Sequence, residues 1–235
     1  MTEEIIKILS AGAPKTGVAR CAEQFASTTG QKFALEFATA PVLRERVNNN
    51  EANADIVVAP EKAFTDFRKN DKVAQNPGGL LGAVKAAVVI RKNSTKPDLA
   101  SGETLKNAIL DADGLVYNRA SSGQYIEKMI ESLGIAESVA DKTLRTPTGA
   151  GVMEHLAESG LGFEIGFGQI TEIQVQIDKG LAVELVGPLP KEVENITPYY
   201  VGLLKAAENK EAATGLVEFM VSDSGKRIFR STGVL

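Results

Sequence analysis

Cysteine, histidine and tryptophan are nearly absent from this chain of 235 residues, and basic residues are not in excess. The sequence has no Trp, one Cys (Cys21) and one His (His155). One of each cannot form an intrachain disulfide or a Cys/His zinc site. Lys and Arg number 26 against 30 Asp and Glu, so the formal net charge is −4. This balance argues against a nucleic acid or an anionic membrane surface as the partner.

Long apolar runs are also missing. No run approaches the roughly 20 residues that span a bilayer, so we expect no membrane insertion. The first ten residues do not place an apolar segment after a basic one, so no secretory signal is visible. We therefore expect a cytoplasmic protein from the sequence as written, or a periplasmic one if an export signal was removed before Met1.

The motifs of the common cofactor-binding folds are absent as well. The segment Gly78–Gly82 does not have the spacing of a dinucleotide-binding loop, and there is no phosphate-binding loop ending in Lys-Ser or Lys-Thr. No helix-turn-helix precedes the chain, which argues against a LysR-type effector domain. We expect no cofactor and no metal.

What is present is the composition of a globular protein, 43% hydrophobic and 24% charged. At about 150 residues per domain, the length fits one large domain or two small lobes. Apolar periodicity predicts alternating strands and helices. The expected strands are 5–10, 32–38, 54–60, 80–91, 114–117, 161–166, 182–186 and 199–204, and the expected helices are 18–26, 41–49, 101–112, 126–133, 148–159 and 209–221.

This alternation predicts an α/β protein of two lobes, each a mixed sheet flanked by helices. Turn residues 76–79 separate the first alternating part from the long strand near 80–91, which would cross between the lobes, and a second strand near 197–204 would return. Lobe 1 would comprise 1–82 and 203–235, and lobe 2 would comprise 83–202, with a ligand cleft between them. Cys21 lies on the apolar stripe of the first helix and is expected to be a core residue.

Two helices are expected to begin without a capping side chain. Ala13-Pro14 and Ala40-Pro41 each follow a strand, at the end where open α/β sheets bind ligands. Alanine cannot accept a hydrogen bond from the first helical N–H groups. These helix starts would therefore offer backbone donors and a positive dipole end to an anion. The alternative is that water satisfies them.

A second group of candidate residues follows strands of lobe 2. Arg119 lies between Asn118 and the hydroxyls of Ser121 and Ser122, and Thr148 begins a later helix. A guanidinium beside hydroxyls and helix-start N–H groups suits a carboxylate. Lys15 would add a second positive charge. The alternatives are an exposed loop arginine and a solvated lysine.

The chain resembles the type II periplasmic-binding-protein fold, most of all the branch related to the molybdate-binding proteins of ABC transporters. Five segments carry the resemblance: Ile8–Ala13, Glu36–Ala40, Ala54–Pro60, Leu161–Gly166 and Phe219–Phe229. The resemblance implies a non-catalytic receptor whose lobes close over a small anion by hinge motion. If the protein is exported, it implies an ABC-transporter permease as a partner.

The sequence departs from that branch at the ligand. The resemblance places serines at the positions of Ala13 and Ala40 and a tyrosine at Ile165, and Pro147 falls where a backbone N–H is often offered. Each lost donor to a buried oxyanion costs about 1–3 kcal/mol. We therefore expect an organic carboxylate rather than molybdate as the ligand.

The same neighbourhood of folds includes trans-aconitate isomerase, which implies an alternative function. The chain would then be a cofactor-free isomerase of a di- or tricarboxylate, and such a proton shift needs one positioned base. Glu164, near the end of an expected strand, is the candidate, with His155 and the region of Lys15 behind it. The alternatives are a Glu164 that points to solvent and a His155 on a helix surface.

Overall fold

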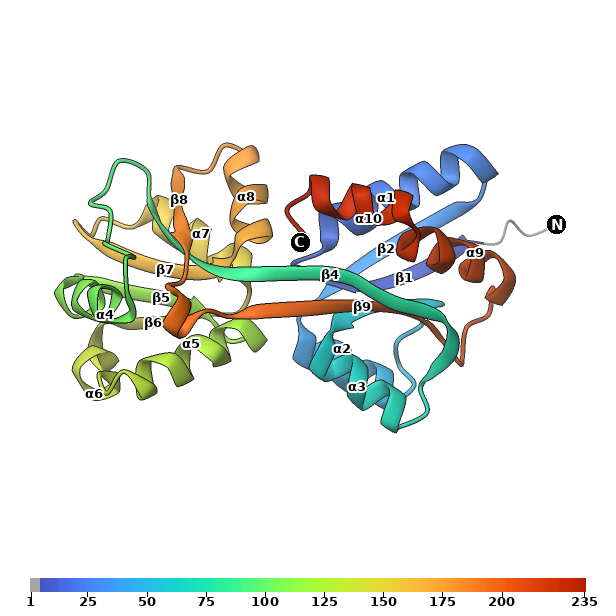
Figure 1. Ribbon diagram of the computed structural model, residues 1–235, viewed down its shortest axis with the longest axis horizontal. Coiled ribbons are helices and arrows are strands. Elements are labelled where there is room, and N and C mark those ends of the chain that lie inside the picture. The colour runs from blue at the N-terminus through green and yellow to red at the C-terminus, as the bar shows by residue number, and fades with distance from the viewer. Residues whose placement is uncertain (1–4) are drawn as a thin grey trace. The chain divides into compact units, whose positions relative to one another are not determined.

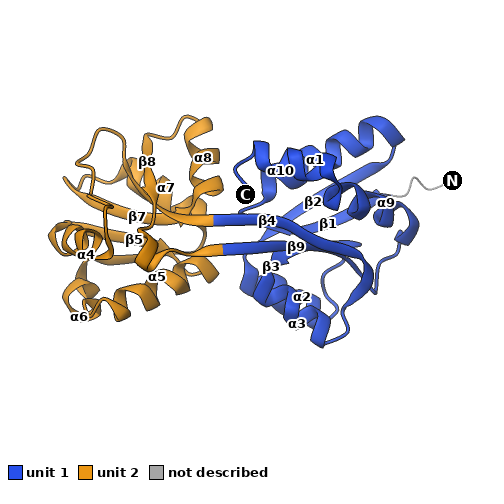
Figure 2. Cartoon of the chain, in the orientation of Figure 1, with its two compact units in different colours: residues 1–84, 197–235 blue, residues 85–196 orange. Residues whose placement is uncertain are grey.

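The computed structural model describes residues 5–235, which divide into two compact units (Figures 1 and 2). Unit 1 is formed by the chain up to residue 84 and by 197–235, and unit 2 by residues 85–196. The chain passes from one unit to the other within strands β4 (Val73–Arg91) and β9 (Ile196–Leu204). The expected boundaries after residue 82 and at residue 203 also fall within these strands.

Unit 1 is a mixed sheet with helices on both faces. Its strand order is β2-β1-β3-β9-β4, with β1 parallel to β2 and β3, and β9 antiparallel to β3. Helices α2 and α3 cover one face, and α1, α9 and α10 cover the other (Figure 1). The further elements of this unit are β1 (Ile5–Ala11), α1 (Lys15–Thr29), β2 (Lys32–Ala38), α2 (Ala40–Asn48), β3 (Ile56–Pro60), α3 (Glu61–Lys69), α9 (Lys210–Val221) and α10 (Asp223–Ser231).

The core of unit 1 is continuous across the sheet and both helix layers. The stripe predicted for the first helix is buried, with Val18, Cys21 and Ala22 all 0% exposed. A Cβ on Gly17 would lie 2.6 Å from a ring carbon of Phe229, so the glycine lets α10 pack directly on α1. The last helix is thereby part of the core of the first unit.

Unit 2 repeats the architecture around its own sheet. Its strand order is β4-β7-β5-β6, and β8 pairs with β4. Strands β5, β6 and β7 are parallel, and β4 is antiparallel to β7. The further elements are α4 (Gly102–Asp111), β5 (Gly114–Asn118), α5 (Ser121–Ser132), α6 (Ala136–Val139), the 3₁₀ turn 140–142, β6 (Thr143–Thr146), α7 (Gly149–Glu158), β7 (Glu164–Gln169), α8 (Ile170–Asp178), β8 (Val183–Pro188) and the 3₁₀ turn 191–193.

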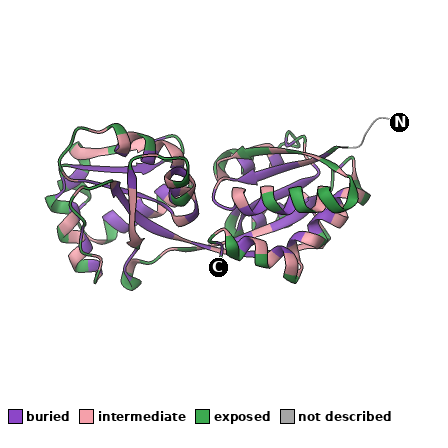
Figure 3. Cartoon of the chain, turned by 90° about the horizontal axis from the view of Figure 1, so that it is seen from above, coloured by how far each residue is buried: buried purple, intermediate pink, exposed green. Residues whose placement is uncertain are grey.

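Alternate residues of the unit 2 strands enter two separate cores, one on each face of the sheet. Val88 and Leu115 pack with α4, α5 and α6, whereas Val89 and Val116 pack with α7 and α8. Successive side chains of a strand point to opposite faces, so a strand buried on both sides reads as an unbroken apolar run. Figure 3 shows the buried strands inside each unit and the exposed residues on its outer surface.

The structure differs from the sequence prediction at several elements. The turn expected at 76–79 lies inside β4, where Gly78 approaches β9 so closely that a Cβ would lie 2.8 Å from the Val201 carbonyl oxygen. Helices α3, α6, α8 and α10 and strand β6 were not among the expected elements. Within residues 5–235, none of the helices has the length and apolar character needed to cross a membrane.

Candidate functional site

The helix starts α1, α2 and α3 lie at one edge of the unit 1 sheet. Helix α1 follows β1, α2 follows β2 and α3 follows β3, and these three strands are parallel. We call the edge of the sheet where such strands end the carboxyl edge, and the opposite edge the amino edge. The N-cap residues are Pro14, Thr39 and Pro60, and no side chain caps any of the three helices. The predicted uncapped starts are therefore present, together with a third.

Two details of the prediction need correction. Pro14 is the N-cap of α1 rather than its first helical residue, and the Lys15 N–H donates to the Gly12 carbonyl at 3.2 Å. Ala40 is the first residue of α2, and Thr39 is its N-cap. Ala13 is buried at 7% exposed. The third start, at Ala59-Pro60, repeats the Ala-Pro pattern and could have been recognised from it.

In unit 2, Asn118 organises the start of α5. Its side chain is buried, and its Oδ1 accepts hydrogen bonds from the N–H groups of Ala120 at 2.8 Å and Gly123 at 3.3 Å. Its Nδ2 donates to the Ser122 hydroxyl at 3.1 Å. The Asn118 side chain thus holds the loop in place, and its contact with a ligand stays a prediction.

Arg145 holds the backbone of the same loop from the neighbouring strand β6. Its Nε donates to the Asn118 carbonyl at 3.3 Å, and its guanidinium lies 4.4 Å from the centre of the Tyr117 ring. The Arg145 Nη1 atom forms an ion pair with the Glu127 carboxylate of α5 at 2.6 Å. The start of α5 is therefore tied to both β5 and β6.

Arg119 and Ser121 are the exposed members of the loop. The Arg119 N–H donates to the Thr146 carbonyl at 2.9 Å, which joins the loops that follow β5 and β6. Within residues 5–235, neither the Arg119 guanidinium nor the Ser121 hydroxyl makes a hydrogen bond or ion pair. A cationic group and a hydroxyl are thus available beside a helix start.

The start of α7 is occupied by the protein's own groups. The Thr148 hydroxyl accepts from the Gly151 N–H at 3.2 Å, so its oxygen serves as the helix cap. The carboxyl group of Glu172, in the first turn of α8, packs against Gly149, where a Cβ would lie 2.9 Å from the Glu172 Cδ. The sequence prediction missed Glu172, because α8 was not recognised.

Glu164 lies at the other edge of the unit 2 sheet. It is the first residue of β7 and is paired with Gly114, the first residue of β5, whereas Asn118 ends β5. Its side chain is only 4% exposed, and one carboxylate oxygen lies 2.7 Å from His155 Nε2. Glu164 therefore does not lie at the end of its strand or point to solvent, and His155 is half-buried and paired.

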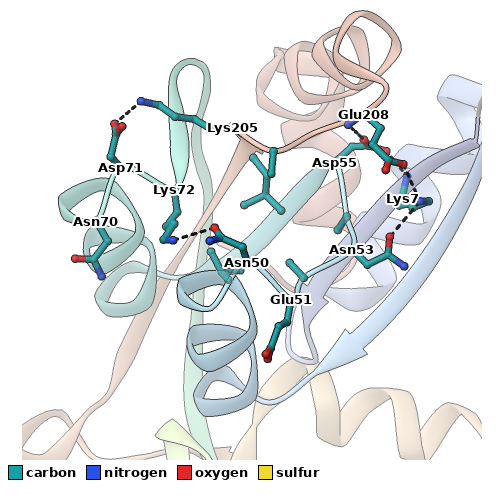
Figure 4. A pocket seen from close by; sticks show the side chains of 15 residues that line it. Lys7, Asn50, Glu51, Asn53, Asp55, Asn70, Asp71, Lys72, Lys205 and Glu208 are labelled. Atoms are coloured by element: carbon teal, nitrogen blue, oxygen red, sulfur yellow. Dashed lines mark hydrogen bonds and ion pairs between the residues drawn. The ribbon is translucent and has the colours of Figure 1, made fainter.

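A cavity of about 650 Å³ in unit 1 also lies away from the helix starts (Figure 4). It opens at the amino edge, around Lys7 of β1 and the loops before β3 and after β9. Its lysines are engaged: Lys7 contacts Glu208, Lys72 contacts Asn50, and Lys205 contacts Asp71. These contacts tie loops of unit 1 together, and no residue of the predicted site lines this cavity.

Cys21 is a core residue, as predicted. It is 0% exposed, and burial raises the pKa of its thiol to about 12. Because the thiolate is the reactive form, we expect no reaction with Ellman's reagent at pH 8 in the native protein. One thiol per chain should react after unfolding in guanidinium. Native reactivity equal to that of the unfolded chain would contradict the burial.

No cluster of three or more His, Cys, Asp or Glu side chains suited to a metal occurs among the described residues. The arrangement offers instead helix N-termini in both units, and one exposed arginine in unit 2. Such groups bind anions through N–H donors and positive charge.

Comparison with known proteins agrees with this fold. The chain is 23% identical over 238 residues to an aconitate isomerase from Pseudomonas sp., a match that covers 97% of this chain and 87% of that protein. A periplasmic molybdate-binding protein from Azotobacter vinelandii superposes with a TM-score of 0.77 at 15% identity, covering 98% of both chains. A sulfate-binding protein from Mycobacterium tuberculosis H37Rv gives a TM-score of 0.79 at 13% identity, covering 98% of this chain and 86% of that one.

These likenesses show the two-lobed fold of type II periplasmic binding proteins. The family described as bacterial extracellular solute-binding protein matches residues 6–235. The chain therefore belongs to the bacterial extracellular solute-binding proteins.

Proposed function

We propose that this solute-binding protein takes a small organic carboxylate, and that one carboxylate group of the ligand binds at the start of α5. The observation that carries the proposal is the exposed Arg119 guanidinium, which has no partner within residues 5–235 and lies beside the unengaged Ser121 hydroxyl. A guanidinium forms paired hydrogen bonds with a carboxylate, and a helix start adds N–H donors.

The side chains at the unit 1 helix starts favour an organic acid over a compact oxyanion. Ala13 has no hydroxyl, and the Thr39 side chain does not cap α2. The uncapped starts of α1, α2 and α3 would supply backbone N–H groups to further oxygens of the ligand. Closure of the two units over that ligand, as expected from the fold, stays a prediction.

Replacing Arg119 with alanine tests the proposed site. A thermal-shift screen of organic acids and oxyanions first identifies the best ligand, and calorimetry then measures its affinity. A hydrogen bond to a charged group contributes about 1.5–3 kcal/mol, so we expect Arg119→Ala to weaken binding by about ten- to a hundredfold. Lys128→Ala, which removes an exposed positive charge further along α5, should leave the affinity unchanged. Equal affinities of Arg119→Ala and the unmodified chain would refute the site.

The second candidate function is isomerisation of a carboxylic acid, favoured by the likeness to an aconitate isomerase. An allylic proton shift needs a base beside the bound substrate. Glu164 is at the amino edge and bound to His155, so it does not meet this requirement. Proton spectra of trans-aconitate incubated with the protein separate the candidates: an unchanged ligand with a raised melting temperature supports the receptor, and conversion supports the enzyme.

Membership of this family also supports a location outside the cytoplasm, where an ABC-transporter permease would receive the ligand. The family is described as extracellular, which favours the exported alternative of the two expected from the sequence.

A further inference from the structure

The peptide unit that joins Asn118 to Arg119 is held at both of its polar groups. Its carbonyl oxygen, which belongs to Asn118, accepts a hydrogen bond from Arg145 Nε at 3.3 Å. Its N–H, which belongs to Arg119, donates to the Thr146 carbonyl at 2.9 Å. Arg145 and Thr146 are consecutive residues of β6, and Thr146 is paired with Asn118 in the parallel ladder with β5. Two successive residues of one strand therefore fix the peptide plane before the Cα of Arg119.

The Arg145 side chain is itself held by Tyr117 and Glu127. Its guanidinium lies 4.4 Å from the centre of the buried Tyr117 ring, and Nη1 forms an ion pair with the Glu127 carboxylate at 2.6 Å. The positive charge of Arg145 is thus balanced inside unit 2, whereas the Arg119 guanidinium makes no hydrogen bond or ion pair within residues 5–235. Arg145 is therefore suited to holding the loop, and Arg119 to receiving an anion.

We propose that Arg145 is a positioning residue, which raises the affinity for a carboxylate by holding the peptide unit before Arg119. The inference rests on the proposed function, in which the Arg119 guanidinium receives the carboxylate. Paired hydrogen bonds between a guanidinium and a carboxylate depend on direction, so a shift of the Arg119 Cα weakens them. Lysine cannot replace Arg145 in this role, because it has no donor at the position of Nε and no planar group to stack on Tyr117.

Arg145→Lys tests the inference, because it keeps a positive charge opposite Glu127 and removes the Nε donor. Amide hydrogen exchange, measured by NMR, reports on the Arg119 N–H, which is protected by its hydrogen bond to Thr146. We expect this amide to exchange about tenfold faster in Arg145→Lys than in the unmodified chain, and the amides of β7 in the same unit to change much less. A contact that only stabilised unit 2 as a whole would accelerate both to the same extent.

Calorimetric titration with trans-aconitate and citrate tests the link to binding. We expect Arg145→Lys to bind these acids about five- to tenfold more weakly than the unmodified chain, with no further loss when Arg119→Ala is already present. Arg91→Lys is the matched control, because the Arg91 guanidinium also holds backbone carbonyls of unit 2, those of Ser159 and Leu161, each at 2.9 Å. It should leave both the affinity and the exchange at Arg119 unchanged.

The outcomes separate this inference from the proposed function. Unchanged exchange at Arg119 in Arg145→Lys, or equal acceleration at Arg119 and in β7, would overturn the role of Arg145, whether or not either acid binds. Full affinity in Arg145→Lys would also overturn it if Arg119→Ala weakens binding, and so would an equal loss with and without Arg119→Ala, since Arg145 would then contact the anion itself. If Arg119→Ala alone leaves the affinity unchanged, the proposed function fails, while faster exchange at Arg119 still supports the hold of Arg145 on the loop. Melting curves check the folding of each variant, and Arg145→Gln is a second removal of the Nε donor.

Discussion

Replacing Asp55 with alanine is expected to lower the free energy of unfolding of unit 1 by about 3–5 kcal/mol, since several N–H groups would lose a charged acceptor and each such hydrogen bond contributes about 1.5–3 kcal/mol. Asp55 precedes β3 and is 1% exposed. Its carboxylate accepts hydrogen bonds from the N–H groups of Lys7 at 2.9 Å, Glu208 at 2.8 Å and Asn209 at 3.0 Å. The side-chain amide of Asn209 adds a fourth at 3.4 Å. Without the carboxylate, these donors would lose the acceptor that joins β1 to the start of α9.

Urea unfolding followed by circular dichroism measures the effect, with Asp71→Asn as the control. Asp71 lines the same cavity, but it is exposed and pairs with Lys205 at the surface, where an ion pair contributes about 0–1 kcal/mol. Asparagine removes the charge and suits the left-handed backbone of this residue, whose φ is 57°. If Asp55→Ala and Asp71→Asn unfold at the same urea concentration, Asp55 does not have this structural role.

Replacing Gly123 with alanine is expected to destabilise unit 2 by about 2–4 kcal/mol and to abolish ligand binding at the start of α5. A Cβ at this position would overlap the Asn118 carbonyl oxygen, and it would lie 2.6 Å from the carbonyl carbon and 2.9 Å from Oδ1. The neighbouring atoms are a strand backbone and the side chain that fixes the loop, so the helix itself must shift. Arg119 and Ser121 would shift with it.

Thermal melting and calorimetry with the best organic acid measure the two effects, and Gly160→Ala is the matched control. A Cβ on Gly160 meets no atom within 4 Å, and its backbone is not left-handed, so the change should alter stability by less than about 0.5 kcal/mol. Full affinity in Gly123→Ala would show that the start of α5 is not the binding place.

The fold class could be predicted because the strands of both units are buried on both faces and alternate with helices that have clear apolar stripes. Val18, Cys21 and Ala22 show such a stripe, and they are buried where the spacing places them. The long strand β4 was predicted only in part. Pro and Gly between residues 76 and 79 indicate a turn in the local sequence, whereas the close approach of β9 to Gly78 keeps the segment in the sheet. A contact between segments that are far apart in the sequence, such as Gly78 and β9, cannot be recognised from the residues around either one.

The candidate site was predicted in part for a similar reason. The uncapped starts of α1 and α2 could be identified because Ala-Pro after a strand is a local signal. Glu164 was wrongly placed, because the strand was expected at 161–166, whereas β7 runs from Glu164 to Gln169. This shift makes Glu164 the first residue of its strand. Glu172 was missed because α8 was not predicted, and its contact with Gly149, a residue of another helix, has no local sequence signal.

The return of the chain to unit 1 determines which unit can be completed first during synthesis. Residues 85–196 are continuous, so the ribosome delivers all of unit 2 before residues 197–235. Strand β9 lies between β3 and β4 in the sheet order. Until it emerges, the growing polypeptide leaves an edge of β3 unpaired, and such edges favour aggregation. The half of the protein that is translated first is therefore the half that finishes folding last.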